Sequence, residues 1–217
     1  SVAGFARLGA TTMKNDAPEK ACAPFDLNRD GTVIGEGAAI MVLETLPHAQ
    51  RRDVPILAEV LGYSLTCDAY HVVAPDPTGD GAARAMRGAL TDAGVTPDEL
   101  DWIVAHGTAT KMNDVIETNA IKMALGESVA RRVPVSSNKG AVGHMIGAAG
   151  AISAVAAVQA IQTGWLAPTI NYATPDPECD LDYVPNRARP ATINTVLVNC
   201  FGFGGQNGCL VLRRWEK

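Results

Sequence analysis

The chain has 217 residues, of which 47% are hydrophobic and 19% are charged. This length and composition suffice for one domain with a sizeable core and are typical of a soluble α/β protein. The formal net charge of −5 argues against nonspecific nucleic-acid binding, which needs a basic face to displace counterions from phosphates. A small basic patch would still suffice for an acidic partner. The candidates, each also consistent with solvated surface charge, are Arg7 with Lys14, Arg51 with Arg52, and Arg131 with Arg132.

In the N-terminal half the pattern predicts strands followed by a helix. Segments 38–46 and 56–64 have the apolar character of strands, and a short helical piece at 48–52 joins them. A helix is predicted at 82–93, because Gly94 follows it as a C-terminal cap.

In the C-terminal half the order of strand, loop and helix occurs twice. A strand at 100–105 precedes a helix at 114–125, where Asp114 is expected as an N-cap or first-turn charge. A strand at 132–137 precedes an uncharged helix that opens at His144 and is expected to be buried on most sides.

A hairpin is predicted at the end of the chain, where strands at 195–199 and 208–213 flank a glycine-rich loop. The apolar stretch at 145–160 contains Ser153 and Gln159, so a buried helix is favoured over a membrane span. Residues 1–9 show no export signal, and the natural location is a reducing cytoplasm. Five irregularly spaced cysteines indicate neither a zinc site nor a disulfide framework; they are Cys22, Cys67, Cys179, Cys200 and Cys209.

His106 and His144 are the strongest candidates for function. Each lies beside glycine in a turn that follows a predicted strand and precedes a predicted helix. In open α/β sheets, ligands bind beyond the carboxyl ends of the strands, where these turns would meet. The two histidines are therefore predicted to converge on one oxygen as neutral hydrogen-bond donors.

Three longer motifs give a specific resemblance. They are Ala-His-Gly-Thr-Ala-Thr at 105–110, Ser-Ser-Asn-Lys-Gly-Ala-Val-Gly-His-Met-Ile-Gly-Ala-Ala-Gly at 136–150, and Asn-Cys-Phe-Gly-Phe-Gly-Gly-Gln-Asn-Gly at 199–208. With further blocks at 24–31, 35–37 and 175–185, the chain resembles the C-terminal half of an elongating β-ketoacyl-acyl-carrier-protein synthase over essentially its whole length.

The resemblance implies an α/β thiolase-like fold, of which residues 1–217 would form the C-terminal βα half, a mixed sheet covered by helices. It implies an acyltransferase that condenses malonyl-carrier protein with an enzyme-bound acyl chain, with loss of carbon dioxide. No metal or separate cofactor is expected, because the phosphopantetheine of an acyl carrier protein carries the substrates.

Four catalytic residues follow from the resemblance. His106 and His144 would donate to the enolate oxygen left by decarboxylation. Lys139 would hold the surroundings of His144 and keep its imidazole neutral through positive potential, and Glu117 would pair with Lys139 and offset its charge. An ordinary helix salt bridge is nearly as good an account of Glu117.

The glycine loop and the first histidine loop supply the other expected site residues. Phe203 would gate the acyl pocket, and a main-chain N–H of its loop, near Gly204, would serve as an oxyanion donor. Phe201 would form a wall of the nucleophile pocket, although both phenylalanines also suit a core. Thr108 and Thr110 match positions that hydrogen-bond the phosphopantetheine arm, or they simply stabilise the loop.

The resemblance also implies what residues 1–217 lack. Relatives carry the acyl chain on a cysteine at a strand-to-helix elbow in the other half of the fold, and no cysteine here has that setting. Cys200 comes nearest, but a packed core thiol is the better reading. The expected partners are a nucleophile-bearing N-terminal half, an acyl carrier protein, and a second copy or a chain-length-factor-like subunit.

Two motifs point to different pathways. Residues 111–114, Lys-Met-Asn-Asp, resemble ketosynthase subunits of type II polyketide systems, whereas Phe-Gly-Phe-Gly-Gly at 201–205 is typical of fatty-acid condensing enzymes. The polyketide role is the first expectation and fatty-acid elongation the second. A non-catalytic chain-length-factor-like subunit is the third, and the intact pair of histidines counts against it.

Overall fold

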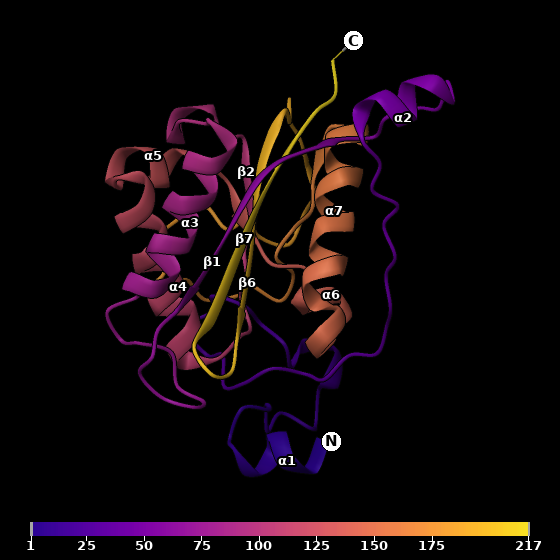
Figure 1. Ribbon diagram of the computed structural model, residues 1–217. Coiled ribbons are helices and arrows are strands. Elements are labelled where there is room, and N and C mark those ends of the chain that lie inside the picture. The colour runs from indigo at the N-terminus through magenta and orange to yellow at the C-terminus, as the bar shows by residue number, and fades with distance from the viewer. Residues whose placement is uncertain (1, 217) are drawn as a thin grey trace.

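In the computed structural model, which describes residues 2–216, a mixed five-stranded sheet lies between two helical layers (Figure 1). The strand order is β1-β7-β6-β2-β3. Strand β7 is antiparallel to both of its neighbours, β1 and β6, whereas β2 pairs parallel to β6 and β3 pairs parallel to β2. The bounds are Glu59–Cys67 for β1, Trp102–Val104 for β2, Val135–Ser136 for β3, Thr195–Gly202 for β6 and Gln206–Arg213 for β7.

The helices form the two outer layers (Figure 1). One face of the sheet carries α3 (Asp80–Ala93), α4 (Lys111–Leu125) and α5 (Glu127–Arg132); the other carries α6 (Lys139–Val142) and α7 (Ala149–Thr163). Alternation along β6 serves both cores, because Leu197 packs under α3 and α4 whereas Val196 and Val198 pack under α7.

Smaller elements lie around this core. The remaining helices are α1 (Val2–Arg7) and α2 (Leu46–Arg51), and β4 (Trp165–Leu166) pairs with β5 (Arg189–Pro190). Three short 3₁₀ turns are η1 (Pro18–Lys20), η2 (Pro97–Glu99) and η3 (Ile146–Ala148). In Figure 1, α1 lies below the sheet and α2 lies at the opposite end of the molecule.

Several sequence predictions are confirmed. The helix predicted at 82–93 is α3, which ends at Gly94 with a φ of 64°. The predicted hairpin is β6 and β7 around the glycine loop, and the helix predicted at 114–125 is α4, which begins three residues earlier.

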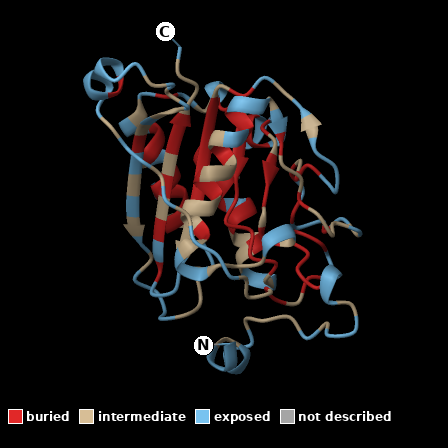
Figure 2. Cartoon of the chain, turned by 90° about the vertical axis from the view of Figure 1, so that its right-hand side faces the viewer, coloured by how far each residue is buried: buried red, intermediate tan, exposed pale blue. Residues whose placement is uncertain are grey.

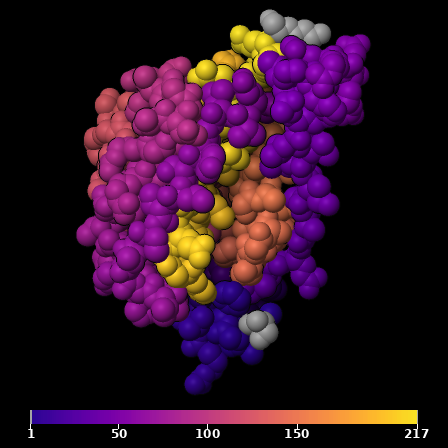
Figure 3. Space-filling view, in the orientation of Figure 1, coloured from indigo at the N-terminus to yellow at the C-terminus, as the bar shows by residue number. Residues whose placement is uncertain are grey.

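The strand predicted at 38–46 is wrong. This segment is extended but pairs with none of the described strands, and Ile40, Val42 and Leu43 are 92%, 83% and 72% exposed. A run of apolar residues that includes β-branched side chains favours an extended backbone, yet a strand also needs a neighbour to bond its N–H and C=O groups. In the space-filling view the surface of α7 and of the hairpin stays open beside this segment (Figure 3).

The prediction that the small-residue helix is buried on most sides is also wrong. By length and composition, Ile146–Thr163 is apolar enough to cross a membrane, with a mean hydropathy of 1.4, yet only a third of it is buried. Ala154, Ala157 and Ile161 pack against the sheet, and the opposite side of α7 is less buried (Figure 2). Nothing among the described residues forms a layer over that side.

Candidate active site

A cavity of about 600 Å³ lies where β2, β3 and β6 reach their carboxyl ends. The loops after β2 and β3 and the tip of the β6–β7 hairpin contribute to its walls, together with α1, α4 and residues 68–75. Seven of the expected site residues line it: His106, Thr108, Thr110, Glu117, His144, Phe201 and Phe203. Lys139 and Gly204 are not among its lining residues.

The two histidines meet in this cavity. Their ring centroids are 5.4 Å apart and their planes are nearly perpendicular, at 83°. His144 Nδ1 accepts the backbone N–H of Ile146 at 3.1 Å, so the neutral ring carries its proton on Nε2. His106 is buried and its Nδ1 has no hydrogen-bond partner. Both rings therefore retain polar capacity for a ligand.

Both imidazoles are neutral at pH 7. Burial lowers the pKa of His144 to about 4, and the positive charge of Lys139 contributes to the same shift. Burial also holds the pKa of His106 well below its ordinary value, with Lys139 and His144 adding to the effect.

Glu117 and Lys139 hold the backbone of His106 from its two sides. Glu117 accepts the N–H groups of His106 and Gly107, each at 2.8 Å, and Lys139 Nζ donates to the carbonyl of His106. The expected direct ion pair between Glu117 and Lys139 is wrong, because each group binds the peptide that lies between them, but their opposite charges still partly offset each other. Burial raises the pKa of Glu117 and lowers that of Lys139.

Two polar residues that received no role from the sequence complete this arrangement. Asn199 on β6 donates to Glu117 Oε1 at 3.1 Å, and Ser137 donates to the carbonyl of Gly107 at 2.7 Å. Both are buried. For Asn199 the signal in the sequence was a polar residue in an apolar strand, because such a residue costs free energy unless it is hydrogen-bonded.

Of the two alternatives expected for Asp114, the structure confirms the first-turn charge and not the N-cap. Thr110 occupies the N-cap of α4, whereas Asp114 is buried, accepts the N–H of Phe25 at 2.7 Å and lies 3.6 Å from Arg29 Nε. Burial raises the pKa of Asp114 to about 6. Arg29 also binds Asp176 and the carbonyl of Thr110, so the cluster anchors the loop that leads into the cavity.

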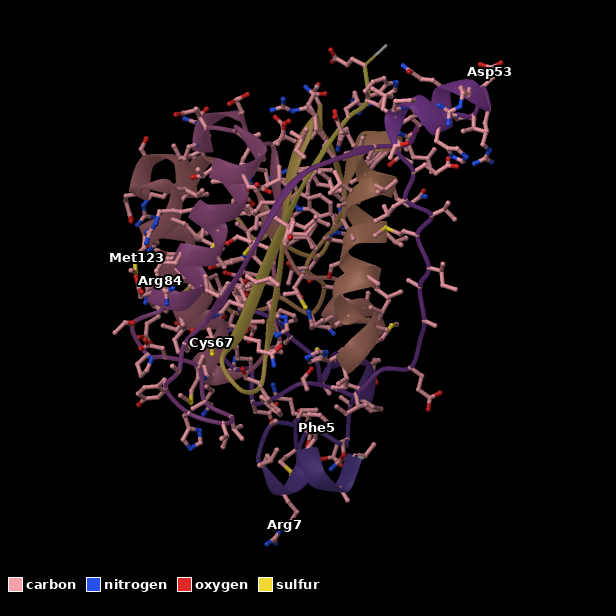
Figure 4. The ribbon with its side chains drawn as sticks, viewed as in Figure 1. Phe5, Arg7, Asp53, Cys67, Arg84 and Met123 are labelled. Carbon is pink, nitrogen blue, oxygen red and sulfur yellow. The ribbon has the colours of Figure 1, made fainter. Side chains whose placement is uncertain are left out.

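The hairpin tip places an aromatic ring over the cavity. Phe203 is 45% exposed and stacks on Phe5 with ring centroids 5.8 Å apart. Phe5 points from α1 toward the body of the molecule (Figure 4). Gly204 has a φ of 84°, and its N–H is bonded to the carbonyl of Val72 at 2.9 Å. This N–H would become an oxyanion donor only if the loop released Val72.

Three further expected residues line the cavity near His106: Thr108, Thr110 and Phe201. The hydroxyls of Thr108 and Thr110 are 2.9 Å apart, with Thr108 buried and Thr110 half-buried. The Phe201 ring lies 5.5 Å from that of His106, so Phe201 forms a wall beside the first histidine.

The cysteines offer no activated thiol at this site. Cys200 lies half-buried on β6, and burial raises its pKa, which disfavours the thiolate. Within residues 2–216, no group of three or more His, Cys, Asp or Glu side chains could hold a metal ion.

Comparison with known proteins identifies the family. The description "Beta-ketoacyl synthase, C-terminal domain" matches residues 57–173, and "Beta-ketoacyl synthase, N-terminal domain" matches residues 1–49. The 3-oxoacyl-[acyl-carrier-protein] synthase 2 of Coxiella burnetii is 49% identical over 213 residues, which are 98% of this chain and 51% of that protein. Its namesake in Synechocystis sp. is 50% identical over 216 residues, 100% of this chain and 52% of that protein. The chain spans about half the length of these curated relatives.

Solved structures agree. One solved structure is that of a type II PKS acyl-carrier protein in complex with its ketosynthase bound to the hexaketide. The matched chain of this complex is 42% identical, with a TM-score of 0.95 over 100% of this chain and 53% of that one. The ishigamide ketosynthase/chain length factor is 45% identical, with a TM-score of 0.92 over 99% of this chain and 50% of that one. With the matching fold and the domain match at 57–173, the chain belongs to the β-ketoacyl synthase family and has its thiolase-like fold.

Proposed function

We propose that residues 1–217 are the C-terminal half of a type II ketosynthase that condenses malonyl-carrier protein with an enzyme-bound acyl chain. The observation that carries this proposal is the pair of neutral imidazoles, 5.4 Å apart, in one cavity of about 600 Å³. A cysteine in the complementary N-terminal half would carry the acyl chain. The proposed setting is the bacterial cytoplasm, with no separate cofactor.

In the proposed reaction, the bond between the malonyl methylene and its carboxylate breaks and carbon dioxide leaves. The electron pair passes to the thioester carbonyl and forms an enolate. His144 donates its Nε2–H to the enolate oxygen, and His106 donates from the other ring. The enolate carbon then bonds to the acyl carbonyl, and the cysteine leaves as a thiolate. Fixed donors lower this barrier because they need no rearrangement when the charge develops.

The surrounding residues have supporting roles in this proposal. Glu117 and Lys139 fix the backbone of His106, and the charge of Lys139 keeps both rings unprotonated. Phe203 gates the acyl pocket. Thr108 and Thr110 line the approach of the phosphopantetheine arm.

Carrier-protein docking is proposed near the cavity mouth. Of the basic pairs, Arg131 is neutralised by Glu127 and Asp180, and Arg132 by Asp98. Arg7 instead points away from the molecule (Figure 4), on the helix whose Phe5 lines the cavity. We therefore assign the acidic carrier protein to the side of α1.

The pathway proposal is a polyketide system. It is supported by the Lys-Met-Asn-Asp stretch at 111–114 and by the two polyketide neighbours above. Fatty-acid elongation is the second candidate, favoured by the 49–50% identity to enzymes named 3-oxoacyl-[acyl-carrier-protein] synthase 2. A chain-length-factor-like subunit stays third.

The test is reconstitution of the chain with the complementary half, malonyl-carrier protein and acyl-carrier protein. One carbon dioxide and one β-ketoacyl product are expected per condensation. Unsaturated or β-keto acyl primers should be extended in a polyketide system, whereas a preference for saturated primers would favour fatty-acid elongation. Binding without carbon dioxide release would overturn the enzymatic proposal.

The low pKa of His144 predicts an unusual pH profile. Protonated imidazole accumulates only as the pH falls toward about 4, so the rate of carbon dioxide release should show no loss near pH 6.5. Lys139→Met removes a positive charge, so the pKa of both histidines should rise. As the pH is lowered, the rate of carbon dioxide release should therefore begin to fall at a higher pH than in the parent.

Lys139→Arg, which keeps the charge, should retain the acid tolerance. Lys122→Met is the matched control, because Lys122 is paired with Asp180 on the surface and does not line the cavity. A parent enzyme that loses half its rate near pH 6.5 would contradict the assignment, as would an unchanged profile in folded Lys139→Met.

A further inference from the structure

Lys111 is an unpaired charge at the cavity. Apart from histidines, it is the only basic residue among the described residues that line this space. It is exposed at the first position of α4, and its ammonium group has no ion-pair partner within residues 2–216.

Burial along one loop shows that Lys111 lies at the mouth. His106 and Thr108 are buried, Thr110 is half-buried and Lys111 is exposed, yet all four line the same cavity. The loop therefore runs from the catalytic floor to the entrance.

The position of Lys111 is electrostatically unfavourable without an anion. The N-terminus of a helix carries partial positive charge, so a cation there is destabilising. The backbone at this point is nevertheless held firmly, because buried Arg29 donates to the carbonyls of Thr110 and Lys111, each at 3.1 Å. The ammonium group of Lys111 is thus unpaired, whereas the backbone that carries it is held in place.

Three of the described acidic residues line the cavity, and all are already occupied; Glu117 accepts the N–H groups of His106 and Gly107. Asp30 accepts the hydroxyl of Thr12 at 2.6 Å and the N–H of Met13 at 3.1 Å. Asp68 accepts the side chain of Asn207 at 2.7 Å. None of the three forms an ion pair with Lys111 within residues 2–216.

We propose that Lys111 binds the phosphate of the phosphopantetheine arm at the cavity mouth while the thioester reaches His106 and His144. This inference rests on the proposed function. An ammonium beside a helix N-terminus suits a phosphate, because the two positive groups then share one anion.

The experiment uses the chain reconstituted with its complementary half. It compares three substrates: malonyl-carrier protein, malonyl-phosphopantetheine and malonyl-pantetheine, of which the last lacks the phosphate. In Lys111→Ala, KM for the two phosphate-bearing substrates should rise about three- to fivefold, the range of an exposed ion pair. The pantetheine substrate should show no such rise, and high salt should shrink the difference. Lys111→Arg should restore KM. Lys20→Ala, another exposed lysine that does not line the cavity, is the matched control.

Each other pattern overturns the proposal. Equal rises with all three substrates would mean a structural effect, and a rise with carrier protein alone would mean a contact with the protein surface. No rise would remove Lys111 from binding. If the parent releases no carbon dioxide from any substrate, the proposed function fails, and calorimetry with phosphopantetheine and pantetheine still tests the phosphate site. If the parent and Lys111→Ala bind phosphopantetheine and pantetheine with the same affinities, the phosphate site is refuted.

Discussion

Replacing His106 or His144 with alanine is expected to lower the rate of malonyl decarboxylation about 10²–10³-fold, the cost typical of removing one oxyanion donor. Each ring is neutral, and the Nε2–H of His144 is fixed by the N–H of Ile146. The hydrogen bond to oxygen strengthens as the enolate forms, so the loss should appear mainly in kcat. Carbon dioxide release by the chain with its complementary half measures the effect.

Controls separate catalysis from folding. His48→Ala removes an exposed histidine on α2, outside the cavity, and should leave the rate unchanged. Circular dichroism should show the parent fold in all variants. Acylation of the nucleophile should be affected less than decarboxylation. Parent rates in both cavity variants would show that the two histidines are structural.

The chain alone is expected to form no β-ketoacyl product and to gain condensation only with the cysteine-bearing half. Two features motivate this. No described cysteine lines the cavity, and Ile40, Val42 and Leu43 expose apolar surface beside an open α7. A stable protein seldom leaves such a patch bare. Light scattering should find this 22.7 kDa chain in a larger complex with its complementary half.

A matched pair of variants tests the surface itself. Val42→Asp should weaken association with the complementary half, because it buries a charge in an apolar interface. Met123→Asp, at an exposed position on α4 on the opposite side of the molecule, should not (Figure 4). A well-folded monomer that condenses substrates unaided would contradict both expectations.

Local patterns predicted the parts of the fold that local interactions decide. Gly94 marked the end of α3, and the glycine-rich loop marked the hairpin. The histidines were found because each lies in a glycine turn after a strand. The segment at 38–46 was misassigned because pairing depends on a neighbour that its own residues do not reveal.

Contacts between distant residues explain the errors at the site. Asp114 is the first-turn acid that the pattern allowed, but its burial beside Arg29, 85 positions earlier, could not be predicted from that pattern. Glu117 and Lys139 looked like an ion pair, but the backbone of His106 lies between them. Opposite charges were correctly placed at one site, whereas the intervening peptide could not be read from their spacing.

The strand order has a consequence for biosynthesis. Within residues 2–216, β7 is the last strand in sequence, yet it lies between β1 and β6 and is the only partner of β1 in the sheet. During translation the edge of β1 therefore stays unpaired while the roughly 140 residues between β1 and β7 are synthesised. The sheet can close only after residue 213 has left the ribosome, so a nascent chain needs protection from edge-to-edge aggregation until then.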